Sequence, residues 1–152
     1  ILSLSGGPIT FSKDQGPIAL NETWQPQFGL TYSGHRGMTK DCVHQVKSFF
    51  DSNPMKAQEI DNQMKESVNL CQKALLAKPN HPEALVQLKL GLDIGKKCFQ
   101  DWGLVDQALE NQMNLLLRQG ALAVKPTGSG GGGYILSLWA SAPPKDVISC
   151  FS

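Results

Sequence analysis

The stretch Gly120–Gly133 reads Gly-Ala-Leu-Ala-Val-Lys-Pro-Thr-Gly-Ser-Gly-Gly-Gly-Gly, and Tyr134–Trp139 continues it as Tyr-Ile-Leu-Ser-Leu-Trp. Gly120 follows a segment of helical apolar spacing, where a glycine is typical of a helix end because it adopts positive φ at little cost. Ala121–Lys125, where the helical spacing ends, is predicted as a first strand, and Tyr134–Trp139, which is rich in aromatic and β-branched residues, is predicted as a second. The chain therefore passes from a helix to a strand, through a glycine loop at 126–133, and into a second strand.

Four interpretations of the glycine loop compete. Gly128–Gly133 formally contains the dinucleotide fingerprint Gly-x-Gly-x-x-Gly, but that fingerprint needs a helix directly after the glycines, and a strand follows here. A P-loop is excluded because no Gly-Lys-Ser/Thr follows. A flexible linker normally joins independent units, whereas these glycines lie between two predicted strands. The functional interpretation is a nest of backbone N–H groups that binds an anion, with Lys125, Thr127 and Ser129 as further donors.

Four helices are predicted between strands at the two ends of the chain. The first starts at Thr39 as N-cap and stops at Asn53-Pro54, the second covers about 55–77, and the fourth covers about 105–119. Gly91 and Gly95 weaken the third by roughly 1 kcal/mol each relative to Ala. Residues at helical spacing predict the inward faces: Val43, Val46, Phe50, Ile60, Met64, Val68, Cys71, Leu75, Leu85, Leu88, Leu92, Phe99, Leu109, Met113, Leu116 and Leu117.

Strands at both ends with helices between them predict an α+β fold, an antiparallel sheet with helices packed on one face. The 152 residues carry 14 Lys+Arg against 13 Asp+Glu, a net charge of +1. That balance gives no general attraction to nucleic acid or to an acidic membrane. No apolar run approaches the ~20 residues of a membrane-spanning helix.

The first residues and the cysteines suggest what kind of parent protein the chain comes from and in which compartment it lies. It begins at Ile1 with Ile-Leu-Ser-Leu, which looks like the inside of a strand, and no signal-peptide pattern follows. We expect a fragment of a longer protein. Cys42, Cys71, Cys98 and Cys150 form no Cys-x-x-Cys, so reduced thiols in a cytoplasmic protein are expected.

Gly120–Gly133 resembles the third conserved motif of the GHMP kinases. In the mevalonate kinases of that family the motif reads roughly Gly-Ala-x-x-Ala-Lys-x-Thr-Gly-Ala-Gly-Gly-Gly-Gly, followed by a strand. Ser33–Lys40 resembles the family's strand end, at which a Thr-Lys pair opens a helix. Ser5–Phe11 resembles the Gly-Gly turn and strand that follow the catalytic carboxylate. The landmarks occur in family order, and among GHMP kinases the chain looks most like the mevalonate kinases.

The resemblance implies a parent enzyme that transfers the γ-phosphoryl group of MgATP to the hydroxyl of a small-molecule alcohol, in the isoprenoid precursor pathway. It implies that residues 1–25 are the end of the N-terminal catalytic domain or linker strands, and that 26–152 form a ferredoxin-like C-terminal domain. ATP and Mg²⁺ are the cofactors expected of the parent, no metal ligand is assigned here, and a homodimer is left open. Thr39 is the implied substrate or phosphate contact. The implied cofactor-binding residues are Gly128, Ser129, Gly130, Gly131, Gly132 and Gly133.

The chain also departs from the family. Ser129 stands where the family usually has Ala, the family's ATP loop Pro-x-x-x-Gly-Leu-Gly-Ser-Ser does not occur, and residues 1–4 contain no catalytic Asp. We therefore expect that this polypeptide alone neither binds ATP tightly nor turns over substrate. The alternatives are another GHMP kinase, acting on phosphomevalonate, homoserine or a sugar, and a degenerate GHMP-like module used for binding or assembly.

A helical-repeat interaction module is the alternative from another class. Lys73–Leu85 resembles the junction of tetratricopeptide repeats, but a shift by the ~34-residue period finds no second Pro-Asn. A lone helix pair cannot bury its apolar face. Asp41 and His44, three residues apart, are expected on an exposed helix face rather than in a metal site. His35, beside Arg36, is a candidate for meeting an anion.

Overall fold

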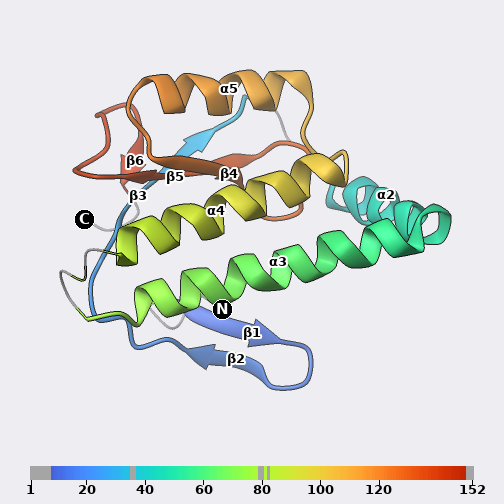
Figure 1. The fold of residues 1–152 in the computed structure, drawn as a ribbon. Helices are drawn as coiled ribbons and strands as arrows, with labels where there is room; N and C mark the ends of the chain where they lie inside the picture. The colour runs from blue at the N-terminus through green and yellow to red at the C-terminus, as the bar shows by residue number, and fades with distance from the viewer. Residues whose placement is uncertain (1–7, 35–36, 79–80, 82, 150–152) are drawn as a thin grey trace.

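The computed structural model describes residues 8–34, 37–78, 81 and 83–149 (Figure 1). The Gly-Gly turn at 5–7, His35, Arg36 and Cys150 lie outside the described residues. The elements follow in the order β1 Ile9–Ser12, β2 Gly16–Ala19, β3 Gln27–Tyr32, α2 Thr39–Ser52, α3 Pro54–Leu75, α4 Ala84–Asp101, α5 Gln107–Arg118, β4 Ala123–Pro126, β5 Tyr134–Trp139 and β6 Ile148–Ser149.

The main sheet has four strands in the order β4-β5-β3-β6, and every neighbouring pair is antiparallel. The central pair joins β3 to β5 in a register that runs from Gln27 opposite Trp139 to Tyr32 opposite Tyr134. β1 and β2 form a separate hairpin. The predicted α+β class and antiparallel sheet are confirmed, and a sheet of this size contradicts an all-helical repeat array.

The helices cover both faces of the main sheet, so their prediction on one face was wrong. Successive residues of a strand point to opposite faces. In β4, Ala123 packs with α3 and α4, whereas Val124 packs with α5. In β5, Leu138 joins the α3–α4 side and Trp139 the α5 side. In Figure 1 α5 accordingly lies on one side of the sheet, with α4 and α3 on the other.

The predicted helices form with ends close to those expected, but some of their faces are rotated. Pro54 is the first residue of α3, a position where its missing N–H costs nothing. In α2 the buried residue is Cys42, and Val43 is exposed. Val68 and Leu117 are exposed as well, because neighbouring residues of their helices face the core.

Gly91 and Gly95 allow α4 to lie close against α3. A Cβ at Gly91 would stand 2.6 Å from Cys71 Sγ and 3.0 Å from the Ser67 carbonyl oxygen. A Cβ at Gly95 would stand 3.0 Å from Ser67 Oγ. The Ser67 hydroxyl donates to the Gly91 carbonyl across this contact, at 2.6 Å. The two glycines therefore serve packing, which offsets their low helix propensity.

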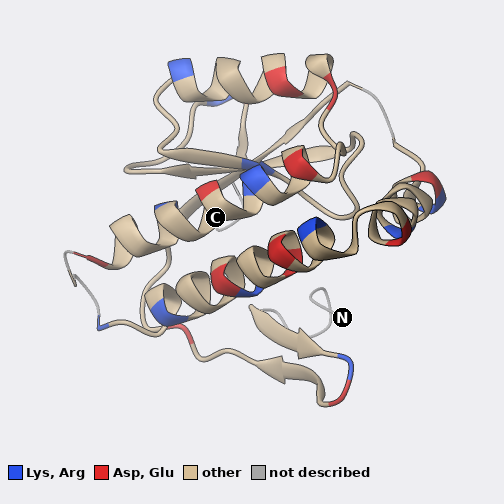
Figure 2. Ribbon diagram, turned by 45° about the vertical axis from the view of Figure 1, so that its right-hand side comes forward, with Lys and Arg blue, Asp and Glu red and all other residues tan. Residues whose placement is uncertain are grey.

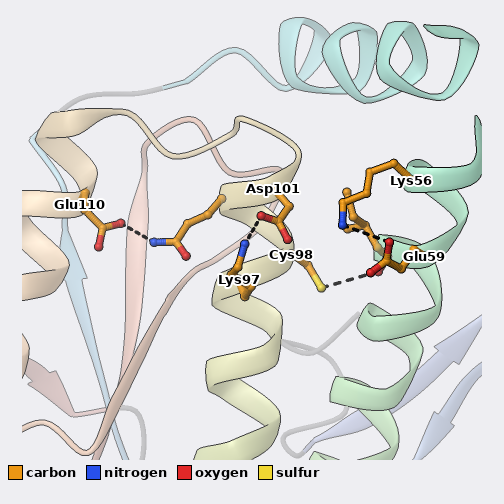
Figure 3. A network of polar contacts seen from close by, with 8 residues as sticks. Lys56, Glu59, Lys97, Cys98, Asp101 and Glu110 are labelled. Atoms are coloured by element: carbon orange, nitrogen blue, oxygen red, sulfur yellow. Dashed lines mark hydrogen bonds and ion pairs between the residues drawn. The ribbon is translucent and has the colours of Figure 1, made fainter. Parts of the chain in front are cut away.

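Polar contacts join α4 to both neighbouring helices (Figure 3). Cys98 Sγ donates to the Ile60 carbonyl of α3 at 3.6 Å, and Gln100 Nε2 donates to Glu110 Oε2 of α5 at 2.8 Å. Lys96 pairs with the same carboxylate at 3.0 Å. Partial burial acts to raise the pKa of Glu110, but the hydrogen bonds from Gln100 and Lys96 outweigh it and hold the pKa below its usual value.

Charges of both signs alternate along the helices in the view of Figure 2. Several are i,i+3 or i,i+4 pairs, such as Lys56–Glu59 and Lys65–Asp61. Exposed pairs of this kind contribute little to stability. Among the described residues, no helix combines the length and apolarity that crossing a bilayer requires.

We expect Gly91→Ala to destabilise the protein although alanine is the better helix former. The propensity gain is about 1 kcal/mol, whereas overpacking against Cys71 and the Ser67 backbone costs about 1–3 kcal/mol. Denaturant unfolding measures the difference. Adding Cys71→Ala should reduce the loss, and a Gly91→Ala variant more stable than the native chain would contradict the close packing.

Glu110→Gln tests the link between α4 and α5. The folded pKa of Glu110 lies below its unfolded value of ~4.3. Its stabilising effect is therefore complete above that value and is lost as the pH falls through the folded pKa. Between pH 7 and pH 3, Glu110→Gln should lose less stability than the native chain. The exposed Glu66→Gln serves as control, and an unchanged pH profile for Glu110→Gln would contradict the link.

Candidate functional site

The glycine loop is a bend that closes the β4–β5 hairpin. Thr127 donates to the Tyr134 carbonyl through both its backbone N–H, at 3.0 Å, and its hydroxyl, at 2.9 Å. These bonds close the base of the bend where the two strands pair. The left-handed backbone that the bend needs is supplied by glycines with φ of 64° at Gly128, 79° at Gly130, 67° at Gly131, 122° at Gly132 and 87° at Gly133.

The bend is docked onto the rest of the fold, which contradicts a flexible linker. The Gly131 N–H donates to the Leu104 carbonyl at 2.8 Å, and Cys42 Sγ donates to the Gly130 carbonyl at 3.6 Å. A Cβ at Gly37 would overlap the Gly131 carbonyl, and one at Gly130 would stand 2.9 Å from Phe99 Cδ1. The bend is therefore held between the segment that precedes α2 and the end of α4.

The N-terminus of α2 meets the bend. Met38 occupies the N-cap position and caps no backbone N–H with its side chain, so Thr39 is the first helical residue and its prediction as N-cap was wrong. The first N–H groups of a helix have no partner within it and carry the positive end of its dipole. Ser129 Oγ donates to Thr39 Oγ1 at 3.3 Å. Two predicted site residues, 90 positions apart, therefore lie side by side.

Several backbone donors of the bend have no acceptor within the part of the chain that the structure describes. They are the N–H groups of Gly128, Ser129, Gly132 and Gly133. Gly128 is exposed and Ser129 half-buried, and the Ser129 hydroxyl lies beside Thr39. Unpaired N–H groups and hydroxyls next to a helix N-terminus are suited to bind the oxygens of an anion.

Lys125, a predicted donor to the bend, is directed elsewhere. Its Nζ donates to the Pro126 carbonyl at 2.9 Å and lies 5.0 Å from the centre of the Phe99 ring. On β4 it shares the face of Ala123, toward α3 and α4. A Cβ at Gly95 would stand 3.2 Å from its Cε. Lys125 therefore extends beneath α4 rather than toward the glycines.

Two pockets flank the bend. One, of about 260 Å³, is lined by Gly128 and Ser129 together with apolar side chains such as Phe99 and Trp102. The other, of about 230 Å³, is lined by Gly131, Asp41 and others. Asp41 and His44 are exposed on α2 as expected. Within the described ranges no cluster of three or more His, Cys, Asp or Glu is arranged to hold a metal ion.

Sequence reasoning missed the residues that hold the bend in place. Gly37 lies within Ser33–Lys40, but its backbone contact with Gly131 joins segments far apart in sequence, which no local pattern predicts. Leu104 accepts the Gly131 N–H through its main chain, which no side-chain motif records. Met38 was not predicted as the N-cap of α2, because the next residue, Thr39, is a more typical capping residue.

Comparisons with known proteins relate the chain to mevalonate kinases. No family model matches the chain. The mevalonate kinase of Pyrococcus horikoshii is 27% identical over 107 residues, which are 70% of this chain and 32% of that protein. The mevalonate kinase of Thermococcus onnurineus is 29% identical over 114 residues, 75% of this chain and 33% of that protein. The crystal structure of L. major mevalonate kinase in complex with R-mevalonate matches with a TM-score of 0.76 at 18% identity, over 88% of this chain and 40% of that one.

The chain is a distant homologue of the mevalonate kinases, which are GHMP kinases, and it spans about a third of the length of the relatives it matches. It has the fold of the C-terminal region of a mevalonate kinase. The predicted resemblance to the mevalonate kinases is thereby confirmed. The separate β1–β2 hairpin fits a boundary near residue 25, and that boundary stays a prediction.

A matched pair of glycine variants tests the docking of the bend. Gly128 and Gly130 both have positive φ, at 64° and 79°, but a Cβ meets nothing within 4 Å at Gly128 and meets Leu104 and Phe99 at Gly130. Alanine costs about 1–2 kcal/mol of backbone strain at either position, and overpacking adds about 1–3 kcal/mol at Gly130. Thermal unfolding should therefore rank Gly130→Ala below Gly128→Ala, and equal losses would contradict a docked bend.

Proposed function

We propose that this chain supplies the phosphate-facing, C-terminal part of an ATP-dependent kinase that resembles mevalonate kinase. The single observation that carries the proposal is the meeting of Ser129 with Thr39 at 3.3 Å, where an uncapped helix N-terminus adjoins a bend with unpaired N–H groups. Distant homology to mevalonate kinases supports the reaction class.

Phosphoryl transfer suits such a site. The transferred group carries negative charge on its oxygens, and catalysis depends mainly on positioning and on donors aimed at that charge. The Thr39 hydroxyl accepts the hydrogen bond from Ser129 and keeps its own hydrogen to donate to a phosphate oxygen. The N–H groups of Gly128 and Ser129 add donors that need no reorganisation because the bend is docked. ATP, when bound with Mg²⁺, supplies the phosphoryl group.

The residues present fit the phosphate part of ATP, but no Mg²⁺ ligand is assigned to this chain. Mg²⁺ is usually held by substrate phosphates and one or two carboxylates. Asp41, close to Gly131 around the smaller pocket, would repel a phosphate placed there, so we assign the phosphate to the Thr39–Ser129 side of the bend. In this assignment Gly128 contributes a donor at the surface. Gly130 and Gly131 instead hold the bend in place, through the packing of Gly130 on Phe99 and the bond from Gly131 to Leu104.

The acceptor proposed first is mevalonate, because the matched relatives are mevalonate kinases. Phosphomevalonate, homoserine or a sugar is the alternative within the GHMP kinases. The ATP loop and the catalytic Asp do not occur in the 152 residues, so turnover requires another polypeptide segment. The cytosolic location stays a prediction, with which the free thiols of Cys42, Cys71 and Cys98 agree.

Steady-state kinetics on the whole natural reading frame that encodes these residues test the proposal. With MgATP and R-mevalonate we expect turnover, and none from the 152-residue chain alone. Thr39→Val should lower kcat/KM about 10²-fold, the usual effect of removing one preorganised donor. Ser48→Ala, exposed farther along α2, is the matched control and should leave kcat/KM unchanged.

Two outcomes would contradict the proposal. Ordinary turnover by the isolated chain would show that it needs no further segment. A whole reading frame that phosphorylates neither mevalonate nor the other acceptors would favour the degenerate module, in which the fold persists without the chemistry.

A further inference from the structure

A further cavity lies between the β1–β2 hairpin, α3, α4 and the sheet, and no residue of the glycine bend lines it. It has a volume of about 390 Å³, within the ~300–1,000 Å³ that small-molecule sites usually have. Its walls come from β1, α3, α4 and the sheet, and Figure 1 shows the β1–β2 hairpin running beside α3. Most of the lining is apolar, including Ile9, Met64, Leu92 and Leu136.

Lys125 is the one lysine that lines this cavity, and none of the described lining residues is an aspartate or a glutamate. Its ammonium donates to the Pro126 carbonyl and lies over the Phe99 ring. An ammonium has three donors, so two remain after the carbonyl contact. Burial lowers the pKa of Lys125, and the nearby Cys71 opposes this effect only in part.

Charge and shape together define a complementary ligand. A buried charge is costly unless it is paired, and no ion pair to Lys125 occurs within the described residues. Burial also raises the pKa of the Cys71 thiol, which keeps that group neutral beside the lysine. A carboxylate offers two oxygens for the two remaining donors, and an apolar tail matches the walls.

We propose that the cavity between β1, α3 and β4 binds a medium-chain aliphatic carboxylate, with its head group on Lys125 Nζ and its tail along the apolar walls. The cavity is distinct from the two pockets beside the glycine bend, because it shares no lining residue with either of them. This proposal does not depend on the proposed kinase reaction, and it can be correct whether or not the chain takes part in that reaction.

Calorimetric titration with decanoate, below its micelle concentration, tests the site. The native chain should bind decanoate, and Lys125→Met should weaken binding at least tenfold while binding decanol as the native chain does. Lys73→Met, exposed on α3, is the matched control and should bind decanoate normally. Equal affinity of Lys125→Met and the native chain for decanoate, or no binding by the native chain, would overturn the proposal.

A second pair of variants covers the case in which Lys125→Met does not fold. Val68 lines the cavity and is 53% exposed, so a polar residue is tolerated there. Val68→Asp places a negative charge at the rim and should weaken decanoate binding several-fold relative to the isosteric Val68→Asn. Decanol should not distinguish the two variants. Equal decanoate affinities for Val68→Asp and Val68→Asn would contradict an anionic head group near Lys125.

Discussion

The backbone contact between Gly37 and Gly131 is the constraint on which the site depends. A Cβ at Gly37 would overlap the Gly131 carbonyl, and a Cβ at Gly131 would stand 2.7 Å from Cys42 Sγ. The Gly131 N–H is at the same time bonded to the Leu104 carbonyl. Glycine is therefore required by space at Gly37, and by both space and a positive φ at Gly131. This contact brings Ser129 to Thr39, and without it the glycine loop would be a tether between two strands.

The sheet and the helices supply the frame for that contact. β4 and β5 fix both ends of the bend through their antiparallel register, from Ala123 opposite Leu138 to Pro126 opposite Ile135. Helices on both faces bury this pair of strands, and the close approach of α4 to α3 at Gly91 and Gly95 positions Phe99 and Leu104 under the bend. A packed interior of this kind is rigid because displaced side chains lose contacts on every side.

Much of this arrangement was predictable from local sequence. β5 forms over Tyr134–Trp139 as predicted, because β-forming residues follow directly on the glycines, and Gly120 has the φ of 106° expected after a helix. The sequence already argued against helices on only one face of the sheet. In β5 the residues of both faces are apolar, such as Leu138 on one face and Trp139 on the other. The direction of Lys125 follows from the same alternation. The meeting of Thr39 with Ser129 was beyond local rules, because only tertiary docking joins segments 90 residues apart.

Backbone dynamics test the central claim most directly. Relaxation of the ¹⁵N-labelled chain yields an order parameter for each amide from Thr127 to Gly133. A docked bend predicts values near ~0.85, as for a rigid backbone. Values below ~0.6 across the glycines would show a flexible tether and contradict the account of a preformed phosphate-facing wall.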